Sequence, residues 1–258
     1  MKAVILAGGF GTRLSEETTL KPKPMVEIAN KPIIWHLMKF FSHYGVNDFV
    51  ICAGYKSEYI KNYFANFFLS NSDIQVNLNQ NTVRILNKQK EDWKIDIIDT
   101  GKNTMTGGRL KRVEQYIGDD DFYFTYGDGL SDVDLNKLLK FHKSNKSIAT
   151  LTAVKTPERF GKLSINNETN IVESFKEKPQ NLNEWINGGF FVLSKKVFNF
   201  IEDDETIFEK HTLEKISEKG MLSAFKHEGF WYAMDKLSDK KYLEERWNTN
   251  KAPWKVWE

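Results

Sequence analysis

Cysteine is nearly absent from this chain: among its 258 residues, Cys52 is the only one. One cysteine excludes an internal disulfide and any zinc site built from several cysteines. The 6 prolines and 16 glycines are too few for a fibrous or disordered chain. The 37 basic and 35 acidic residues leave a formal charge of only +2, so the basic excess of a general nucleic-acid-binding protein is missing as well.

Long hydrophobic runs are missing too. The apolar run at residues 3–7 is too short for the core of a signal peptide, and no run approaches the roughly 20 apolar residues of a membrane span. We therefore expect a cytoplasmic protein that binds neither membranes nor nucleic acids. The chain is long enough to bury a large core. Its 7 tryptophans and 19 phenylalanines predict an aromatic-rich core or a surface that is buried in an oligomer.

The hydrophobic pattern predicts alternating strands and helices in the first half of the chain. Short apolar runs predict buried strands at 2–6, 49–53, 122–126, 148–154 and 222–227. Helical spacing predicts helices at 33–41, 55–68, 107–117 and 238–247, and two helices within 195–219. Alternation of strand and helix is typical of a parallel, doubly wound sheet with right-handed crossovers.

Other segments predict a smaller antiparallel part. Residues 73–99 and 162–193 alternate apolar and polar side chains, as half-exposed strands do, and Asn187-Gly188-Gly189 lies between two such strands. Asp132 or Asp134 can cap a helix that runs to about residue 143. Together these patterns predict a Rossmann-like α/β fold with a mixed, mainly parallel sheet flanked by helices and a small additional β region. A single domain over residues 1–258 accounts for this fold.

The most informative stretch follows the first strand and reads Leu6-Ala7-Gly8-Gly9-Phe10-Gly11-Thr12-Arg13-Leu14. Its glycines let the backbone approach a ligand closely, and successive N–H groups in such a turn form an anion-binding concavity. Arg13 can pair with phosphate oxygens through two parallel hydrogen bonds. The stretch lacks the Gly-Lys-Ser/Thr ending of a Walker A loop and the third glycine of a dinucleotide fingerprint. The alternative interpretation is an ordinary tight turn.

Prolines shape the segment that follows this loop. Pro22 and Pro24 predict an extended backbone, and no helix is expected before Pro24. Lys21 and Lys23 alternate with these prolines, so their side chains should point to opposite sides and one of them can face the phosphates. The alternative is a solvated basic loop.

Asp128 ends the strand at 122–126 between Gly127 and Gly129. Ligands bind at this position in open α/β sheets, and a carboxylate oxygen there suits Mg²⁺, which bridges triphosphate oxygens. The alternative is a turn aspartate. Cys52 is interpreted as inert packing. The five histidines are interpreted as structural: His36, His43, His142, His211 and His227.

The motifs, in this order, carry a resemblance that spans nearly the whole chain. After the glycine loop come Lys21-Pro22-Lys23-Pro24-Met25, Tyr126-Gly127-Asp128-Gly129, Glu177-Lys178-Pro179, Asn187-Gly188-Gly189 and, at the end of residues 231–235, Asp235. In these motifs the chain resembles the sugar-1-phosphate nucleotidyltransferases. Segments 15–18, 99–101, 104–112, 159–161 and 252–257 make it most similar to the members that transfer a cytidylyl group from CTP to α-D-glucose 1-phosphate, giving CDP-glucose and pyrophosphate.

The resemblance implies an in-line attack of the sugar phosphate oxygen on the α-phosphorus. That oxygen is already anionic at neutral pH, so the protein has only to position the substrates and neutralise charge. The resemblance also implies Mg²⁺ as cofactor, CTP and glucose 1-phosphate as partners, and a homo-oligomer that is hexameric or trimer-based. The alternatives are dTTP or UTP as donor, or a non-catalytic subunit that binds nucleotide sugars. The tail with Trp254 and Trp257 packs either on its own core or at a subunit contact.

The resemblance further assigns roles to individual residues. Asp128 and Asp235 would hold the metal, although Asp235 alone would fit a helix N-cap near residue 238. The catalytic set it implies is Arg13, Lys23 and Lys178. The nucleotide-binding set, within residues 1–130, is Leu6, Ala7, Gly8, Gly9, Gly11, Thr12, Arg13, Lys23, Thr104, Arg109, Gly127 and Asp128. The substrate-binding set, within the sugar-phosphate part at 131–258, is Glu177, Lys178, Asn187 and Gly188.

Overall fold

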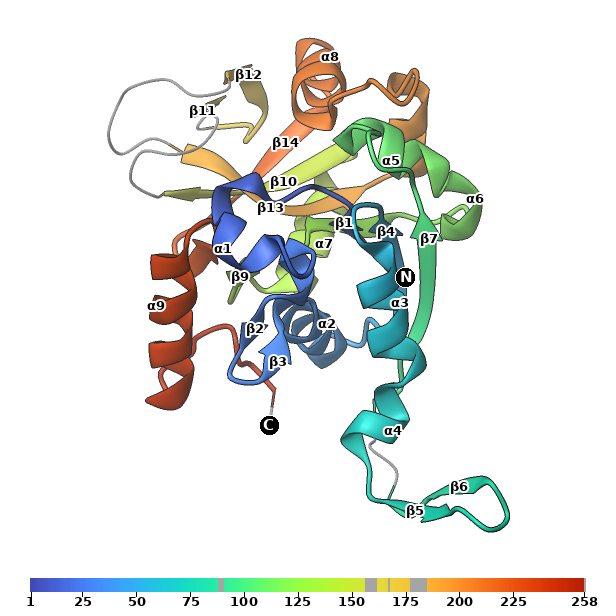
Figure 1. The fold of residues 1–258 in the computed structure, drawn as a ribbon. Coiled ribbons are helices and arrows are strands. Elements are labelled where there is room, and N and C mark those ends of the chain that lie inside the picture. Colours follow the sequence, from blue (N-terminus) through green and yellow to red (C-terminus); the bar gives the residue numbers. More distant parts are fainter. Residues whose placement is uncertain (88–90, 156–161, 167, 177–184, 258) are drawn as a thin grey trace.

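The structure is a computed structural model that describes residues 1–87, 91–155, 162–166, 168–176 and 185–257. Nine strands in this part of the chain form one central sheet (Figure 1). They are β1 (Lys2–Ala7), β4 (Asp48–Ala53), β7 (Lys94–Asp99), β8 (Phe122–Tyr126), β10 (Ala149–Lys155), β11 (Lys162–Ile165), β12 (Val172–Lys176), β13 (Trp185–Leu193) and β14 (Leu222–His227). Three smaller pairs join β2 (Glu27–Ile28) to β3 (Lys31–Pro32), β5 (Ile74–Asn77) to β6 (Thr82–Ile85), and β9 (Gly129–Ser131) to β15 (Trp231–Ala233).

Helices cover both faces of the sheet. The α-helices are α1 (Ser15–Thr18), α2 (Ile33–His43), α3 (Ser57–Ala65), α4 (Phe67–Asn71), α5 (Thr106–Arg112), α6 (Glu114–Ile117), α7 (Leu135–Asn145), α8 (Leu213–Glu218) and α9 (Leu237–Asn248). Short 3₁₀ turns are η1 (Thr12–Leu14), η2 (Lys23–Met25) and η3 (Lys195–Phe200), and η4 (Phe208–Thr212) is a single π-helical turn. No helix in the described part of the chain is long and apolar enough to cross a bilayer.

The sheet has a parallel half and a largely antiparallel half. Strands β8, β1, β4 and β7 are neighbours in this order and run parallel. Next to β8 lies β13, which runs antiparallel to it and to β10 and β11. The predicted Rossmann-like α/β fold with a mixed sheet is confirmed. One sheet contains strands from residues 1–130 and from 131–258.

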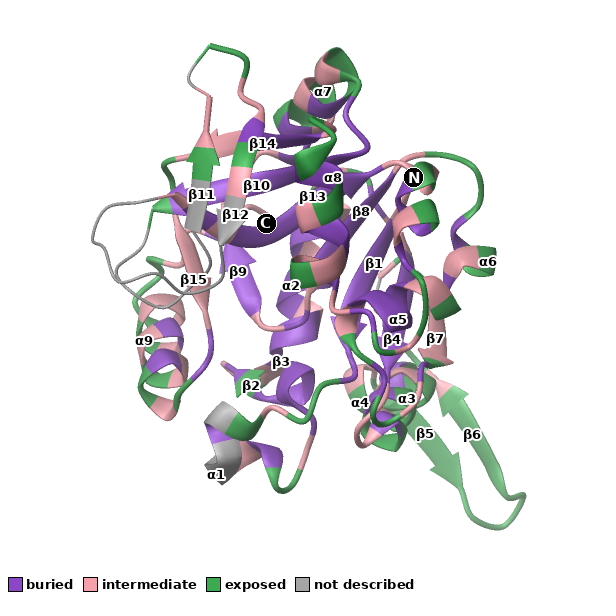
Figure 2. Cartoon of the chain, turned by 90° about the horizontal axis from the view of Figure 1, so that it is seen from above, coloured by how far each residue is buried: buried purple, intermediate pink, exposed green. Residues whose placement is uncertain are grey.

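Burial on both faces explains why β1 is apolar without a break after Lys2. Ala3 and Ile5 point into one core, which also holds Phe41 of α2, whereas Val4 points into the other, which holds Leu110 of α5. Adjacent strand residues face opposite sides, so a strand between two helical layers must be apolar throughout. Figure 2 shows the central strands buried and the outer parts exposed. Each large apolar side chain among them, such as Ile5 or Phe41, contributes about 1.5–3 kcal/mol to stability when fully buried.

Three local predictions about the backbone are wrong. Two short helical turns, η1 and α1, precede Pro24, because the prolines restrict only the residues from 21 onward and Thr18 donates to Leu14 O and Gly11 O in front of them. Lys23 begins a 3₁₀ turn rather than an extended segment, since proline is well suited to a first helical turn. Residues 187–189 lie inside β13 and not between two strands. The pairing of β13 with β10 shifts its register at these residues.

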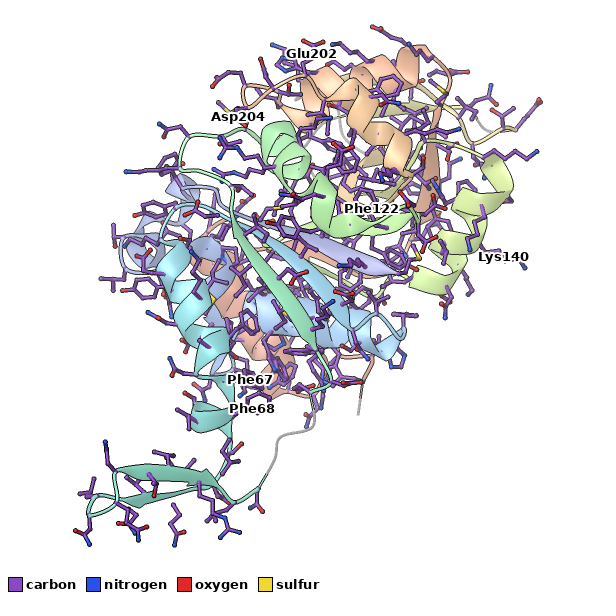
Figure 3. All side chains as sticks on the ribbon, turned by 90° about the vertical axis from the view of Figure 1, so that its right-hand side faces the viewer. Phe67, Phe68, Phe122, Lys140, Glu202 and Asp204 are labelled. Atoms are coloured by element: carbon purple, nitrogen blue, oxygen red, sulfur yellow. The ribbon has the colours of Figure 1, made fainter. Side chains whose placement is uncertain are left out.

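A hairpin arm, defined here as residues 73–86 with strands β5 and β6, extends away from the body beyond α4 (Figures 1 and 3). The sequence pattern of residues 73–99 predicts half-exposed strands, but β5 is exposed on both faces. The arm carries five exposed large apolar side chains: Ile74, Val76, Leu78, Val83 and Leu86. An isolated two-stranded hairpin is only marginally stable in water unless further strands or a helix pack against it. The exposed side chains of the arm show that both of its faces lack such packing within the described part of the chain.

The C-terminal tail packs on its own chain. Trp254 is fully buried, and its ring lies 6.4 Å from that of His36 and 6.5 Å from that of Trp247. Burial lowers the pKa of His36 to about 4, and its Nε2 lies 2.9 Å from Ile28 O. Packing on its own core is therefore the correct one of the two predicted roles for Trp254.

Candidate active site

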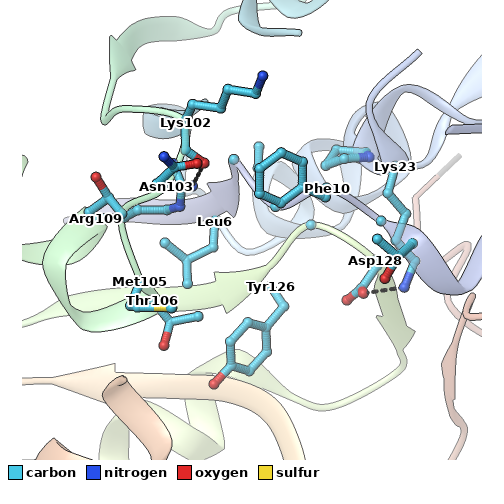
Figure 4. Close-up of a pocket in the computed structure, with 18 residues that line it drawn as sticks. Leu6, Phe10, Lys23, Lys102, Asn103, Met105, Thr106, Arg109, Tyr126 and Asp128 are labelled. Carbon is cyan, nitrogen blue, oxygen red and sulfur yellow. Dashed lines mark hydrogen bonds and ion pairs between the residues drawn. The ribbon is translucent and has the colours of Figure 1, made fainter. Parts of the chain in front are cut away.

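A cavity of about 430 Å³ opens at the carboxyl ends of β1 and β8 (Figure 4). Strand β4 follows β1 on one side, while β8 pairs with β1 on the other, so the cavity lies where the strand order reverses. Ligands of open α/β sheets bind at this switch point. Its lining comprises Leu6, Ala7, Gly8, Gly9, Phe10, Gly11, Thr12, Lys23, Pro24, Lys102, Asn103, Thr104, Met105, Thr106, Arg109, Tyr126, Gly127 and Asp128.

Two glycines of the loop after β1 are required by their surroundings. A Cβ atom on Gly8 would lie 2.2 Å from Nη1 of Arg109, well inside contact distance. Gly11 has a φ of +65°, where other residues are strained, and its Cβ would lie 2.8 Å from Cγ2 of Thr18. Gly9 has open space around it. The loop is therefore fixed by Gly8 and Gly11 while Gly9 remains open toward the cavity.

Arg109 lines the cavity from α5, but its guanidinium group binds the protein itself. Nη1 donates to Thr100 Oγ1 at 2.9 Å and to Gly101 O at 2.6 Å, and Nη2 donates to Lys102 O at 3.1 Å. The residue is only 4% exposed, and burial lowers the pKa of its guanidinium. Arg109 thus holds the loop at 100–102 against the glycine loop.

The beginning of α5 is covered by a loop of the second half of the chain. Met105 N donates to Asp204 O at 2.8 Å, and Gly107 N donates to Thr206 O at 2.9 Å. The carboxylate of Asp204, labelled in Figure 3, accepts from Arg112 Nε at 2.9 Å. These contacts occupy N–H groups that a helix start would otherwise offer to an anion, so the glycine loop is the better phosphate cradle.

A charged cluster forms where the predicted metal ligands meet the predicted phosphate-binding lysine. Nζ of Lys23 lies 2.6 Å from Asp128 Oδ2 and 2.7 Å from Asp235 Oδ1. The Lys23 and Asp235 side chains are only 10% and 5% exposed, while that of Asp128 is 29% exposed. Burial by itself would lower the pKa of Lys23, but the two carboxylates outweigh burial and raise it. The ammonium group is therefore firmly charged.

Asp235 is not the N-cap of the last helix. The N-cap is Lys236, and Asp239 at position N3 completes a capping box: its Oδ2 accepts from Lys236 N at 2.7 Å and from Asp235 N at 2.9 Å. This arrangement fixes the backbone of Asp235 and leaves its carboxylate directed at Lys23. Of the two caps predicted for the helix that ends near residue 143, Asp134 is the correct one, because its Oδ1 accepts from Lys137 N at 2.9 Å at the start of α7.

The donor chemistry of this cluster fits a magnesium ion. Asp128 and Asp235 each place an oxygen within 2.7 Å of the same nitrogen, so both can reach one cation. In the described part of the chain, no group of three or more histidine, cysteine, aspartate or glutamate side chains could hold a metal. Two carboxylates completed by water and substrate phosphates are the usual Mg²⁺ environment, because Mg²⁺ seldom uses an all-protein cage.

Two of the residues predicted to contact the sugar, Asn187 and Gly188, lie in β13 close to Tyr126. Asn187 Oδ1 accepts from Gly189 N at 2.8 Å, and Gly188 O accepts from the indole N–H of Trp231. A Cβ on Gly189 would lie 2.6 Å from the ring of Tyr126, which itself lines the cavity. Asn187 and Gly188 are not part of the cavity lining, but they are next to Gly189, which packs against the Tyr126 ring of that lining.

Sequence reasoning missed a polar network below the cavity. The carboxylate of Glu209, in η4, accepts from the hydroxyl of Tyr126 and from Thr106 Oγ1. Burial and this carboxylate raise the pKa of Tyr126 well above its usual range, so its hydroxyl stays protonated. Tyr126 stands in the Tyr126-Gly127-Asp128-Gly129 motif of the sequence, although no role was predicted for it, whereas Glu209 had no comparable signal.

Three predicted residues lie wholly or partly outside the described part of the structure. Glu177 and Lys178 lie outside the described residues. Arg13 belongs to η1, but its side chain is outside the described part of the structure. Of the predicted nucleotide-binding residues, the cavity lining includes all others, from Leu6 to Asp128.

Comparison with known proteins agrees with this geometry. Residues 2–239 match the family model described as nucleotidyl transferase. A glucose-1-phosphate cytidylyltransferase of Salmonella typhi is 53% identical over 259 residues, covering 100% of both chains. A probable glucose-1-phosphate cytidylyltransferase of Bacillus subtilis is 41% identical, with 100% of each chain covered. The crystal structure of HddC from Yersinia pseudotuberculosis is similar with a TM-score of 0.76 and 28% identity, covering 95% of this chain and 99% of that one. This chain therefore belongs to the nucleotidyl transferase family.

Proposed function

We propose that this protein is an enzyme that transfers the cytidylyl group of CTP to α-D-glucose 1-phosphate, giving CDP-glucose and pyrophosphate. The observation that carries the proposal is the 53% identity over the full length to the glucose-1-phosphate cytidylyltransferase of Salmonella typhi. The cavity supports it, since a glycine loop, a lysine and two carboxylates gather at the switch point of the sheet. Nucleotide binding is assigned to residues 1–130 and sugar-phosphate binding to residues 131–258.

The attacking group is an oxygen of the sugar phosphate, so the reaction needs no general base. The task of the protein is to hold the two substrates in line and to offset the charge of the triphosphate. We assign triphosphate contacts to Lys23, Arg13 and the N–H groups of the glycine loop. We assign contacts with glucose 1-phosphate to Glu177, Lys178 and the segment Asn187-Gly188. Mg²⁺ held by Asp128 and Asp235 would supply further positive charge at the phosphate oxygens.

The hairpin arm supports the further proposal of a homo-oligomer. Its five exposed apolar side chains, which are between 41% and 88% exposed, present on the order of 500 Å² per copy, and a stable interface buries about 800 Å² per partner. We therefore place a second copy of this chain against the arm. CTP and sugar phosphates are charged and therefore do not cross a lipid bilayer unaided. We also propose that the enzyme is cytoplasmic, where these substrates are made.

Oligomerisation can be tested by size-exclusion chromatography with light scattering. The pair of substitutions Leu78→Asp and Val83→Asp should reduce the assembly to smaller species. Leu20→Asp, at a residue 69% exposed on the body, should leave it intact. A monomeric wild-type protein would reject this part of the proposal.

The activity is tested by incubating the purified protein with Mg²⁺, glucose 1-phosphate and one nucleotide at a time. Pyrophosphate release and CDP-glucose, followed by mass spectrometry, are expected with CTP and lost on addition of EDTA. Equal turnover with dTTP or UTP would replace the cytidylyl assignment by a thymidylyl or uridylyl one. No turnover with any nucleotide or sugar phosphate would leave a non-catalytic nucleotide-sugar-binding subunit as the function.

A further inference from the structure

We propose that Lys23 is the resident cation of the metal site: its ammonium group holds Asp128 and Asp235 together in the ligand-free protein and leaves when a divalent cation binds. The inference rests on the proposed function only in treating these two carboxylates as cation ligands. It assigns Lys23 a positioning role in addition to its contact with the triphosphate.

The ammonium group of Lys23 occupies the position between the two carboxylates. Lys23 Nζ lies between the two carboxylates, 2.6 Å from Asp128 Oδ2 and 2.7 Å from Asp235 Oδ1. Both distances are those of short charge-assisted hydrogen bonds. A magnesium ion bound to the same two oxygens, at about 2.0–2.1 Å from each, would take nearly the same position. The ammonium group and the ion therefore exclude one another by both volume and charge.

Burial explains why a cation must be present before any ligand arrives. The side chain of Asp235 is 5% exposed, and a buried carboxylate beside another one is costly without a compensating charge. Lys23 supplies that charge from η2, 105 and 212 residues away in the sequence. A lysine also suits the exchange, because its compact ammonium group sits on a flexible stem.

The cavity gives the displaced ammonium group somewhere to go. Lys23 and Asp128 both line the cavity (Figure 4), so the lysine can turn toward phosphate oxygens without crossing the core. Binding of the divalent cation and binding of the triphosphate then support each other, because each stabilises the same displaced position of Lys23. Such coupling is reciprocal by thermodynamic necessity. Without nucleotide, the cation should bind weakly.

The test is a titration of the protein with Mn²⁺, followed by electron paramagnetic resonance, without nucleotide or sugar phosphate. Lys23→Met should bind Mn²⁺ roughly tenfold or more tightly than the wild type, because the competing charge is gone. Adding Asp128→Asn to this variant should abolish the gain. The matched control is Lys21→Met, since Lys21 pairs with Glu27 at 3.0 Å instead, and it should bind as the wild type does. Equal affinity of Lys23→Met and wild type would overturn the inference.

A second measurement uses the wild-type protein, in case Lys23→Met does not fold. Acetylation with acetic anhydride, read by mass spectrometry, should label Lys23 more strongly with saturating Mn²⁺ than without it. Lys21 serves as the internal reference. Unchanged labelling of Lys23 would also overturn the inference. Neither measurement needs CTP or turnover. An inactive protein would therefore reject the proposed function, while Mn²⁺ binding and the labelling of Lys23 could still be measured.

Discussion

The contact between Gly8 and Arg109 predicts a large stability difference between two adjacent glycines. In Gly8→Ala the new Cβ would lie 2.2 Å from Nη1 and 2.6 Å from Cζ of Arg109, so the guanidinium group must move. Moving it breaks the bonds from Nη1 to Thr100 and Gly101. A hydrogen bond to a charged group is worth about 1.5–3 kcal/mol. Partial repair by water reduces the loss of unfolding free energy to about 2–4 kcal/mol.

Urea unfolding followed by circular dichroism measures this loss. Gly9→Ala is the matched control: its Cβ would meet nothing within 4 Å, so its unfolding free energy should stay within about 0.5 kcal/mol of wild type. A double-mutant cycle identifies the cause. In the Arg109→Met background, Gly8→Ala should cost less than about 0.5 kcal/mol, because the clashing group is gone. Equal losses in Gly8→Ala and Gly9→Ala, or an undiminished loss in the Arg109→Met background, would refute the reasoning.

Three further predictions concern the metal ligands, the last helix and the buried histidine. Asp128→Asn should lower kcat for CDP-glucose formation roughly 30- to 1,000-fold, a loss of about 2–4 kcal/mol of transition-state stabilisation, with an unchanged melting temperature as the check on folding. Asp239→Ala removes the acceptor for Asp235 N and Lys236 N and should cost about 0.5–2 kcal/mol in urea unfolding. His36 has a folded pKa of about 4 against 6.5 when unfolded. Only the unfolded chain takes up this proton as the pH falls from 6.5 to 4, so stability is lost in that window, by up to about 3 kcal/mol. His36→Gln should flatten this part of the stability profile, and an unchanged pH dependence would contradict the assignment.

The parallel half of the sheet could be predicted from the sequence because its signals are local. The strand at 122–126 needs both faces buried, and that requirement appears directly as an apolar run. The glycine loop was recognisable for the same reason, since the turn and its ligand-facing N–H groups come from consecutive residues. The interior position of Asn187-Gly188-Gly189 was missed because it depends on pairing with β10, which is distant in the sequence. The short turn α1 was missed although the bond from Thr18 to Leu14 O is local, because the restriction by the prolines was extended too far back along the chain.

The functional meaning of charged residues was harder to predict than their location. Arg109 and Lys23 both lie in glycine- or proline-rich segments, and both line the cavity. Their partners decide what each can do. Arg109, in α5, binds backbone oxygens of the loop at 100–102 and holds that loop in place, whereas Lys23 binds two carboxylates that a divalent cation could also bind. No local pattern distinguishes these two cases.

The difference between the two cations follows from what surrounds them. Backbone carbonyls carry no net charge, so they do not attract a second cation in place of the guanidinium group. Displacing Arg109 would therefore leave buried hydrogen-bond acceptors unsatisfied. The carboxylates around Lys23 carry two negative charges, which a divalent ion neutralises better than an ammonium group does. The first arrangement is therefore permanent and the second exchangeable. Chemistry in this cavity depends on the exchangeable cation, while the shape of the cavity depends on the permanent one.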